Sequence, residues 1–172
     1  MRSLENLFAG DDLRSIGKSN SVVKLIASQS GFDELFEMLF HPNRIIVMRA
    51  ADAVEKITVG NPEYLIKHKR KILKLIGSAG NKELMWHLAL LIPRLHFNKN
   101  VLDEVCSTLT KWLKDKTNSR IVRVNSLQGL FEIAKKNPAM MKKFILLLNS
   151  ISAENVPSLN ARVRMIRKQL SQ

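Results

Sequence analysis

The chain has 172 residues, of which 45% are hydrophobic and 25% charged, with only 7 glycines and 5 prolines. This length is that of one ordinary domain with a sizeable core, and the composition excludes a disordered, collagen-like or low-complexity protein. The single cysteine, Cys106, excludes a disulfide framework and a cysteine-based zinc site. There are 28 Lys and Arg residues against 15 Asp and Glu residues, which gives a net charge of +13. The composition therefore predicts a basic, globular protein.

No segment is typical of a membrane span or of an export signal. The longest apolar stretches, residues 88–93 and 144–148, are far shorter than the ~18 residues that a span needs. The N-terminal region contains Glu5, Asp11 and Asp12 and lacks the apolar core of a signal peptide. With a lone cysteine that suits a reducing compartment, we expect a cytoplasmic protein that does not bind membranes.

Apolar residues recur at spacings of three and four along nearly the whole chain, which is the period of an α-helix. Breaks rich in Gly, Pro, Asn and Ser separate these segments, and several of them place a proline near a helix start. The sequence therefore predicts about nine helices and no sheet. In chain order the expected helices lie at residues 21–29, 32–40, 46–57, 62–76, 84–95, 100–113, 122–133, 138–148 and 159–170.

Four of these segments align with one another, namely residues 46–57, 84–95, 122–133 and 159–170. Their last residues are 38, 38 and 37 positions apart, and the segments between them supply a partner helix for each. A period of this size with two helices per unit is typical of an α-solenoid. We predict an all-α, right-handed α-solenoid of about four helical hairpins that spans residues 1–172 as a single repeat domain. Residues 1–20 would form an N-terminal cap and residues 21–170 the stacked pairs.

The stretch LFHPNRIIVMRAADAVEKI, residues 39–57, resembles a HEAT repeat. It has the end of a first helix, a Pro-Asn turn and a second helix with an Ala-Ala-x-Ala pattern. The resemblance extends over most of residues 32–170, and it implies an armadillo-type solenoid. The Arg that HEAT repeats carry early in the second helix is kept only as Arg123, whereas the matching positions hold Val47, Met85 and Asn160. Segments 49–56, 86–95 and 119–130 resemble a group of small bacterial HEAT-repeat proteins of unknown activity.

In an α-solenoid the second helix of each pair lines the concave side. Aligning the four copies separates an apolar stripe, which predicts the core, from a second row that mixes charges of both signs with amides. Such a row is typical either of a solvated helix face or of a binding groove. The candidate groove residues of this row, together with the neighbouring Trp86, are Arg49, Asp52, Lys56, His87, Arg94, Asn125, Gln128 and Arg162.

Several residues in this region allow more than one interpretation. Trp86 suits either the core or a stacking anchor in the groove. His87 is of the residue type that titrates near neutral pH, but no second ligand at the required spacing makes it a metal site. Asp52 and Glu55 are neighbours on one helix and suit either intrahelical ion pairs or a catalytic carboxylate pair. Pro93 is expected to kink its helix and to widen the groove.

Motifs of catalysis are missing from the sequence. There is no glycine-rich phosphate loop, no G-x-S-x-G and no H-E-x-x-H. Cys106 lies within an apolar helical pattern, so we expect a small core residue rather than a nucleophile. We expect no catalytic residue, no cofactor and no metal, and we interpret the chain as a binding protein rather than an enzyme.

The basic charge is concentrated beyond the first third of the chain. Residues 1–60 have 7 Lys and Arg against 8 Asp and Glu, a net charge of −1, whereas residues 61–172 have 21 against 7, a net charge of +14. The densest run is at residues 67–71. This asymmetry indicates an acidic partner, and the candidate phosphate contacts are Arg94, Arg162 and Arg164. Aromatic residues, which stack on bases, make up only 6% of the chain.

Together these features favour a non-enzymatic binding or scaffold module whose concave groove holds a protein or peptide partner. The alternative is a nucleic-acid-binding protein with a basic groove, similar in architecture to the HEAT-like-repeat DNA glycosylases. A third alternative is a role like that of the phycobilin lyases, which also contain HEAT-like repeats. The last two rest on likeness of architecture and not on matched site residues.

Overall fold

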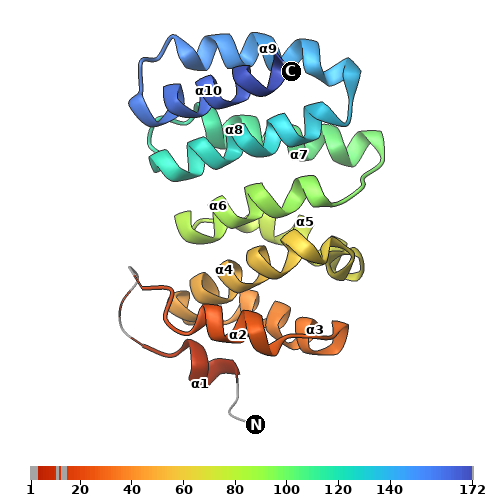
Figure 1. Ribbon diagram of the computed structural model, residues 1–172, viewed down its shortest axis with the longest axis vertical. Helices are drawn as coiled ribbons and strands as arrows, with labels where there is room; N and C mark the ends of the chain where they lie inside the picture. The colour runs from red at the N-terminus through yellow and green to blue at the C-terminus, as the bar shows by residue number, and fades with distance from the viewer. Residues whose placement is uncertain (1–3, 11, 13–14, 172) are drawn as a thin grey trace. The chain divides into compact units, whose positions relative to one another are not determined.

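The computed structural model describes residues 4–10, 12 and 15–171, and these form ten α-helices and three short 3-10 helices without a strand (Figure 1). The predicted all-helical class is confirmed. The chain divides into two compact units, residues 1–95 and 96–172, which are described separately below. The single repeat domain expected from the sequence stays a prediction. Within the expected N-terminal cap, residues 1–3, 11 and 13–14, including Asp11, lie outside the described residues.

The first unit is built around α4, Arg44–Gly60, on which α1, α2, α3 and α6 all pack. Ten of the 17 residues of α4 are buried, among them Ala50, Ala51 and Ala53, whose small side chains let neighbouring helices approach closely. The other elements of this unit are α1 Leu4–Phe8, α2 Ser19–Leu25, α3 Gln29–Glu37, η1 Met38–Phe40, η2 Pro62–His68, α5 Lys69–Ser78, α6 Lys82–Leu91 and η3 Ile92–Arg94.

The second unit is built in the same way around α8, Arg120–Lys135, which packs against each of the other three helices. Those helices are α7 Lys99–Lys114, α9 Pro138–Ser152 and α10 Pro157–Leu170. They are arranged as two pairs, α7 with α8 and α9 with α10, which lie side by side (Figure 1). The apolar stripe predicted for α8 and α10 is buried, as Val122, Ile133 and Val163 illustrate, except at its last residue, Leu170, which is 39% exposed.

Several helices start at the breaks predicted from the sequence, with a capping side chain or a proline in the first turn. The side-chain oxygens of Asn43 and Asn98 accept hydrogen bonds from the backbone N–H groups of Ile45, at 2.9 Å, and Val101, at 3.0 Å. Pro138 and Pro157 occupy the first turns of α9 and α10, where a missing N–H costs no hydrogen bond. These boundaries are therefore fixed by local sequence.

Three predicted helices end differently from expectation. The helix expected at residues 21–29 ends at Leu25, and Gln29 already begins α3. The helix expected at residues 62–76 is divided into η2, Pro62–His68, and α5, Lys69–Ser78. The helix expected at residues 84–95 stops at Leu91, and Pro93 lies in the 3-10 helix η3 that follows. Because proline has no N–H to continue the α-helical ladder, the chain tightens into a 3-10 turn at this point instead of kinking within a continuous helix.

Candidate binding surfaces

Asp52 and Lys56 of the predicted groove row join α4 to α2. Lys56 Nζ donates to Asp52 Oδ2 at 2.7 Å and to Asn20 Oδ1 at 2.8 Å, and the hydroxyl of Ser19 donates to Asp52 Oδ2 at 2.5 Å. Ser19 is fully buried, whereas Asp52 and Lys56 are half-buried. The cluster therefore stabilises the packing of α2 on α4, with part of its charge open to solvent.

Arg49, another residue of that row, is buried rather than placed on a groove. Its guanidinium donates to four backbone carbonyls of the N-terminal segment: Phe8 at 2.9 Å, Ala9 at 2.7 Å, Asp12 at 3.1 Å and Ser15 at 3.0 Å. A surface role for Arg49 does not fit this environment. Its structural role is to hold the N-terminal segment against α4, and we leave it out of the proposed binding surface.

Two glycines of the N-terminal segment make room for this guanidinium. Gly10 has φ +144° and Gly17 has φ +55°, backbone conformations that side-chain-bearing residues rarely adopt. A Cβ at Gly10 would lie 2.7 Å from Arg49 Nη1, and a Cβ at Gly17 would lie 2.9 Å from Arg49 Cζ. Glycine at these two positions therefore lets the backbone approach the guanidinium closely.

Arg94 lies in η3 and connects it to α4. Its Nη1 donates to the backbone carbonyl of Glu55 at 2.6 Å and to Thr58 Oγ1 at 2.5 Å, and its Nη2 donates to Glu55 Oε1 at 2.8 Å. Glu55 and Asp52 thus have separate cationic partners, Arg94 and Lys56. This arrangement agrees with ion pairing and not with a catalytic pair of carboxylates.

His87 is buried close to this cluster. Its Nδ1 lies 4.0 Å from Glu55 Oε2 and has no hydrogen-bond partner among the described residues. Burial lowers the pKa of His87 to about 4, and the charges of Lys56 and Arg94 also lower it while that of Asp52 raises it. This pKa lies below the neutral range in which histidine side chains ordinarily titrate, because the low-polarity environment disfavours the imidazolium. Trp86 is half-buried, and its ring contacts that of His87 at a centroid distance of 5.3 Å.

The basic run at residues 67–71 is partly engaged within the first unit. Lys67 and His68 both contact the carboxylate of Asp33, His68 at 2.7 Å, and Lys71 pairs with Glu37. Burial would raise the pKa of Asp33, but hydrogen bonds from Lys67 and two further side chains lower it to about 2. Part of the charge that indicated an acidic partner is therefore neutralised by the chain itself.

In the second unit, side chains of the predicted groove row connect α8 to α10. Arg162 Nη1 donates to Gln128 Oε1 at 2.8 Å, and Gln128 Nε2 donates to Glu132 Oε1 at 2.7 Å. Asn125 lies half-buried on α8, one turn before Gln128, and Arg164 is exposed on α10. The structure therefore brings Gln128 and Arg162 together.

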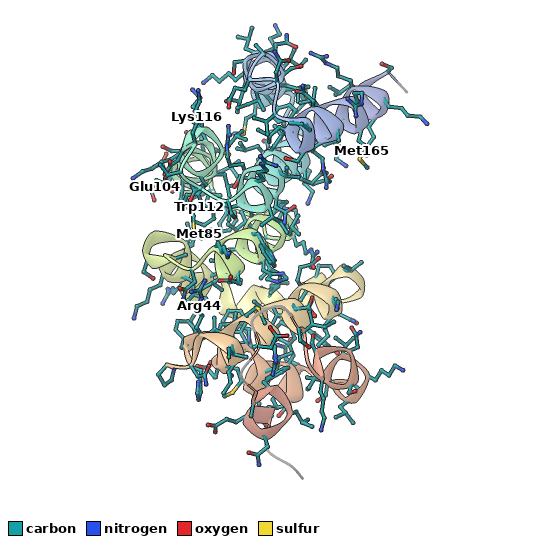
Figure 2. The ribbon with its side chains drawn as sticks, turned by 90° about the vertical axis from the view of Figure 1, so that its left-hand side faces the viewer. Arg44, Met85, Glu104, Trp112, Lys116 and Met165 are labelled. Carbon is teal, nitrogen blue, oxygen red and sulfur yellow. The ribbon has the colours of Figure 1, made fainter. Side chains whose placement is uncertain are left out.

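Two exposed apolar residues flank that pair. Ile121 lies two turns before Gln128 on α8 and is 42% exposed, and Met165 lies one turn after Arg162 and is 55% exposed. Figure 2 shows Met165 projecting from the opposite side of the second unit to Glu104 and Lys116. We call the surface of Ile121, Asn125, Gln128, Arg162 and Met165 the α8–α10 face.

Two part-buried ion pairs were not predicted from the sequence. Arg44, labelled in Figure 2, donates to Glu83 Oε2 from Nη2 at 2.7 Å, and Glu83 is buried. Arg123 donates from Nε to the carbonyl of Leu113 at 2.6 Å and from Nη2 to Glu154 Oε2 at 2.7 Å. The separation of 39 residues between Arg44 and Glu83, about one repeat period, is the signal that would have revealed the first pair.

A groove of about 690 Å³ lies between α7 and α9 over α8. Its floor is formed by Leu130 and Ala134 of α8, and lysines from α7 and α9 are among its lining residues. Cys106 lines this groove and is half-buried, so the expected core position is wrong. Burial and the nearby Asp103 raise the pKa of its thiol to about 11, which keeps it protonated and unreactive at neutral pH. The sequence analysis missed this groove.

Within the part of the chain that the structure describes, no group of three or more His, Cys, Asp or Glu side chains is placed to hold a metal ion. None of the described helices combines the length and the apolar character needed to cross a bilayer. No protein-family model, curated protein or solved structure matches the chain.

Proposed function

We propose that this chain is a non-enzymatic binding module, built as a HEAT-like solenoid of about four helical pairs, that holds a protein or peptide partner on its second helices. Support for the repeat comes from polar pairs that join positions about one period apart within each unit. Lys56 pairs with Asn20 over 36 residues, Arg94 with Glu55 over 39 and Arg162 with Gln128 over 34. Similar side-chain bridges between successive helical pairs are expected when equivalent helices stack.

The α8–α10 face is the observation that carries this function. It combines exposed apolar side chains, Ile121 and Met165, with an amide–guanidinium pair that is half-buried and held in place. Met and Arg are enriched in protein interfaces, and a fixed polar pair beside exposed apolar surface provides both desolvation energy and directional hydrogen bonds. A peptide is therefore the class of ligand that this face suits best.

The test is selection of a random peptide library, displayed on phage, against the purified protein. We expect a shared motif to be enriched on the wild type and lost on Met165→Glu. The matched control is Ile145→Glu, which places the same charge on an exposed apolar position of α9. No enriched motif, or a motif that binds Met165→Glu as well as the wild type, would contradict the proposal.

A second candidate function is nucleic-acid binding, which the charge of the second unit favours. Residues 96–171 contain 14 Lys and Arg against five Asp and Glu, and 12 of the 14 cations are exposed in this described range. Exposed cations that neutralise phosphates release counterions, so binding would weaken steeply with salt. Such a surface would bind the phosphate backbone of a nucleic acid and would not recognise particular bases.

Titration of labelled duplex DNA and hairpin RNA across a salt series tests this second candidate. The informative variant is the double reversal of Arg162 and Arg164 to Glu, with Lys142→Glu/Lys143→Glu as the equally charged control. Arg94 is left out because it bonds Glu55 and Thr58, so its reversal would disturb the fold. If both arginines contact duplex phosphates, the slope of log K against log salt falls by roughly 1.8. Equal slopes for the two double variants would exclude the α8–α10 face as the contact.

A further inference from the structure

The groove between α7 and α9 has walls from two helices that pack on α8 rather than on each other. On α7 its lining residues recur at helical spacing from Lys99 to Lys114, so one face of this helix borders it along the whole length. Lys99 and Lys114 are 15 positions apart, which corresponds to about 22 Å along an α-helix. The groove is therefore long, and it is open to solvent along its outer side.

The lining of the groove contains both apolar and basic side chains. Leu130 and Ala134 form the floor, and Phe144 and Leu147 of α9 line the wall. Leu146, also a lining residue, is 72% exposed and adds apolar surface beside the wall. The lower part of the groove therefore offers an apolar contact surface that no described element of the second unit covers.

Three lysines line the groove at separate places, Lys99 at the start of α7, Lys114 at its end and Lys143 on α9. All three are exposed. The one acidic lining residue is Asp103, which lies 3.7 Å from Lys99. Asp103 offsets the charge of Lys99, and each edge keeps one lysine without an acidic partner in the lining, Lys114 on α7 and Lys143 on α9.

We propose that this groove docks an amphipathic helix with acidic edges, supplied by a partner protein. An apolar floor with cationic edges is complementary to a helix whose apolar stripe is bordered by Asp or Glu. A length of about 22 Å accommodates about four turns of helix. Because the groove is open on its outer side, its occupant needs a polar outer surface, which an amphipathic helix has.

A single-chain anion such as a fatty acid fits these features less well. It has one carboxylate, which would neutralise only one of Lys114 and Lys143, the two lining lysines that have no acidic partner among the lining residues. Its alkyl chain would also remain in contact with water along the open side, which forfeits much of the free energy of burial. The distribution of the lysines along the groove therefore favours the helix.

The groove is separate from the α8–α10 face. Leu130 on the floor and Gln128 on that face are two residues apart on α8, so they point about 200° apart around the helix axis. The two proposals can therefore fail independently, because variants of the groove lie on α7 and α9 and leave Arg162 and Met165 unchanged.

The probe for the experiment is a fluorescein-labelled 16-residue peptide, cross-linked into a helix, with Leu on one face and Glu along both edges of it. Binding is measured by fluorescence anisotropy in 50 mM NaCl. Control peptides have the same residues in scrambled order, or Lys in place of every Glu. The matched protein variants are Lys143→Glu, which changes a lining residue, and Lys142→Glu, which changes its exposed neighbour outside the lining. Ser107→Trp fills the groove from an exposed lining position, with Ser107→Ala as its control.

We expect the acidic helix to bind the wild type and both control variants, and to bind better than either control peptide. Lys143→Glu should weaken binding about three- to tenfold relative to Lys142→Glu, since a nearby attraction becomes a repulsion. Ser107→Trp should weaken it about tenfold or more. Equal binding by Lys142→Glu and Lys143→Glu, or by the acidic and scrambled peptides, would overturn the proposal. Binding of dodecanoate that Ser107→Trp abolishes, with no preference for the acidic peptide, would assign the groove to a single-chain anion instead.

Discussion

Arg94 and Glu55 form a two-point contact between η3 and α4. The Nη2 of Arg94 lies 2.8 Å from Glu55 Oε1, while its Nη1 lies 2.6 Å from the carbonyl oxygen of the same residue. One guanidinium therefore fixes both the side chain of Glu55 and the backbone of α4 near its C-terminal end. Because Thr58 Oγ1 is also an acceptor, at 2.5 Å, three acceptors lose one hydrogen bond each if Arg94 is removed.

Replacing Arg94 by Ala should lower the free energy of unfolding by about 1–3 kcal/mol, the usual effect of leaving part-buried polar groups unpaired. Arg94→Lys should restore only part of this loss, because an ammonium cannot reproduce the fork of the guanidinium. Urea unfolding followed by circular dichroism measures the change. Arg70→Ala, an exposed position on α5, is the control and should be near neutral. If the two alanine variants unfold at the same urea concentration, the contact does not stabilise the fold.

Replacing Arg49 by Met should loosen the N-terminal segment. The four carbonyls of Phe8, Ala9, Asp12 and Ser15 would lose their charged donor. Hydrogen exchange followed by mass spectrometry should show faster exchange in peptides from residues 4–20, while peptides from the C-terminal half of α4 change little. Lys24→Met on α2 is the control. Unchanged exchange in residues 4–20 would exclude this anchoring role.

His87 should make stability depend on pH between about 6.5 and 4. Its pKa is lower in the folded chain than in the unfolded chain, so the unfolded state takes up the proton first as the pH falls. The contribution of neutral, buried His87 is complete above pH 6.5 and is lost progressively toward pH 4, by at most about 3 kcal/mol. Urea midpoints at pH 7 and pH 4.5 measure it.

His87→Asn should remove much of this pH dependence, whatever its effect on stability at pH 7. The comparison variant is His96→Asn, which makes the same substitution at an exposed histidine, and the loss of slope should be larger in His87→Asn than in His96→Asn. A slope that persists in full in His87→Asn would assign the pH dependence to other groups.

Cys106 should react slowly with alkylating reagents in the folded protein. Since burial raises its pKa from 9.0 to about 11, the thiolate fraction near pH 8 is about 100-fold lower than for an unperturbed thiol. Iodoacetamide labelling at pH 8, followed by intact-mass spectrometry, should therefore be much slower in native buffer than in 6 M urea. Equal rates in the two conditions would show that the thiol is not shielded in the groove.

The polar row shows which part of a site local sequence can predict. Helical periodicity predicted that Asp52 and Lys56 share one face of α4, where they form an ion pair, and Gln128 and Arg162 of the same row form a hydrogen bond between α8 and α10. It could not tell that Arg49, in the same register, points into the N-terminal segment, because that contact joins residues about 40 positions apart. The partner of each side chain depends on which helix packs opposite, and periodicity within one helix contains no information about its neighbour.

The sequence by itself determined the helical class, most of the helix boundaries and the apolar stripe. These follow from spacing, capping residues and prolines, which act over a few neighbouring residues. Only the tertiary structure decided that His87 is too buried to titrate near neutral pH, that Arg94 bonds Glu55 and that α7 and α9 leave a groove over α8. A pKa, a long-range hydrogen bond and the volume of a groove all depend on distances between helices, and these distances are set by how side chains of different helices pack.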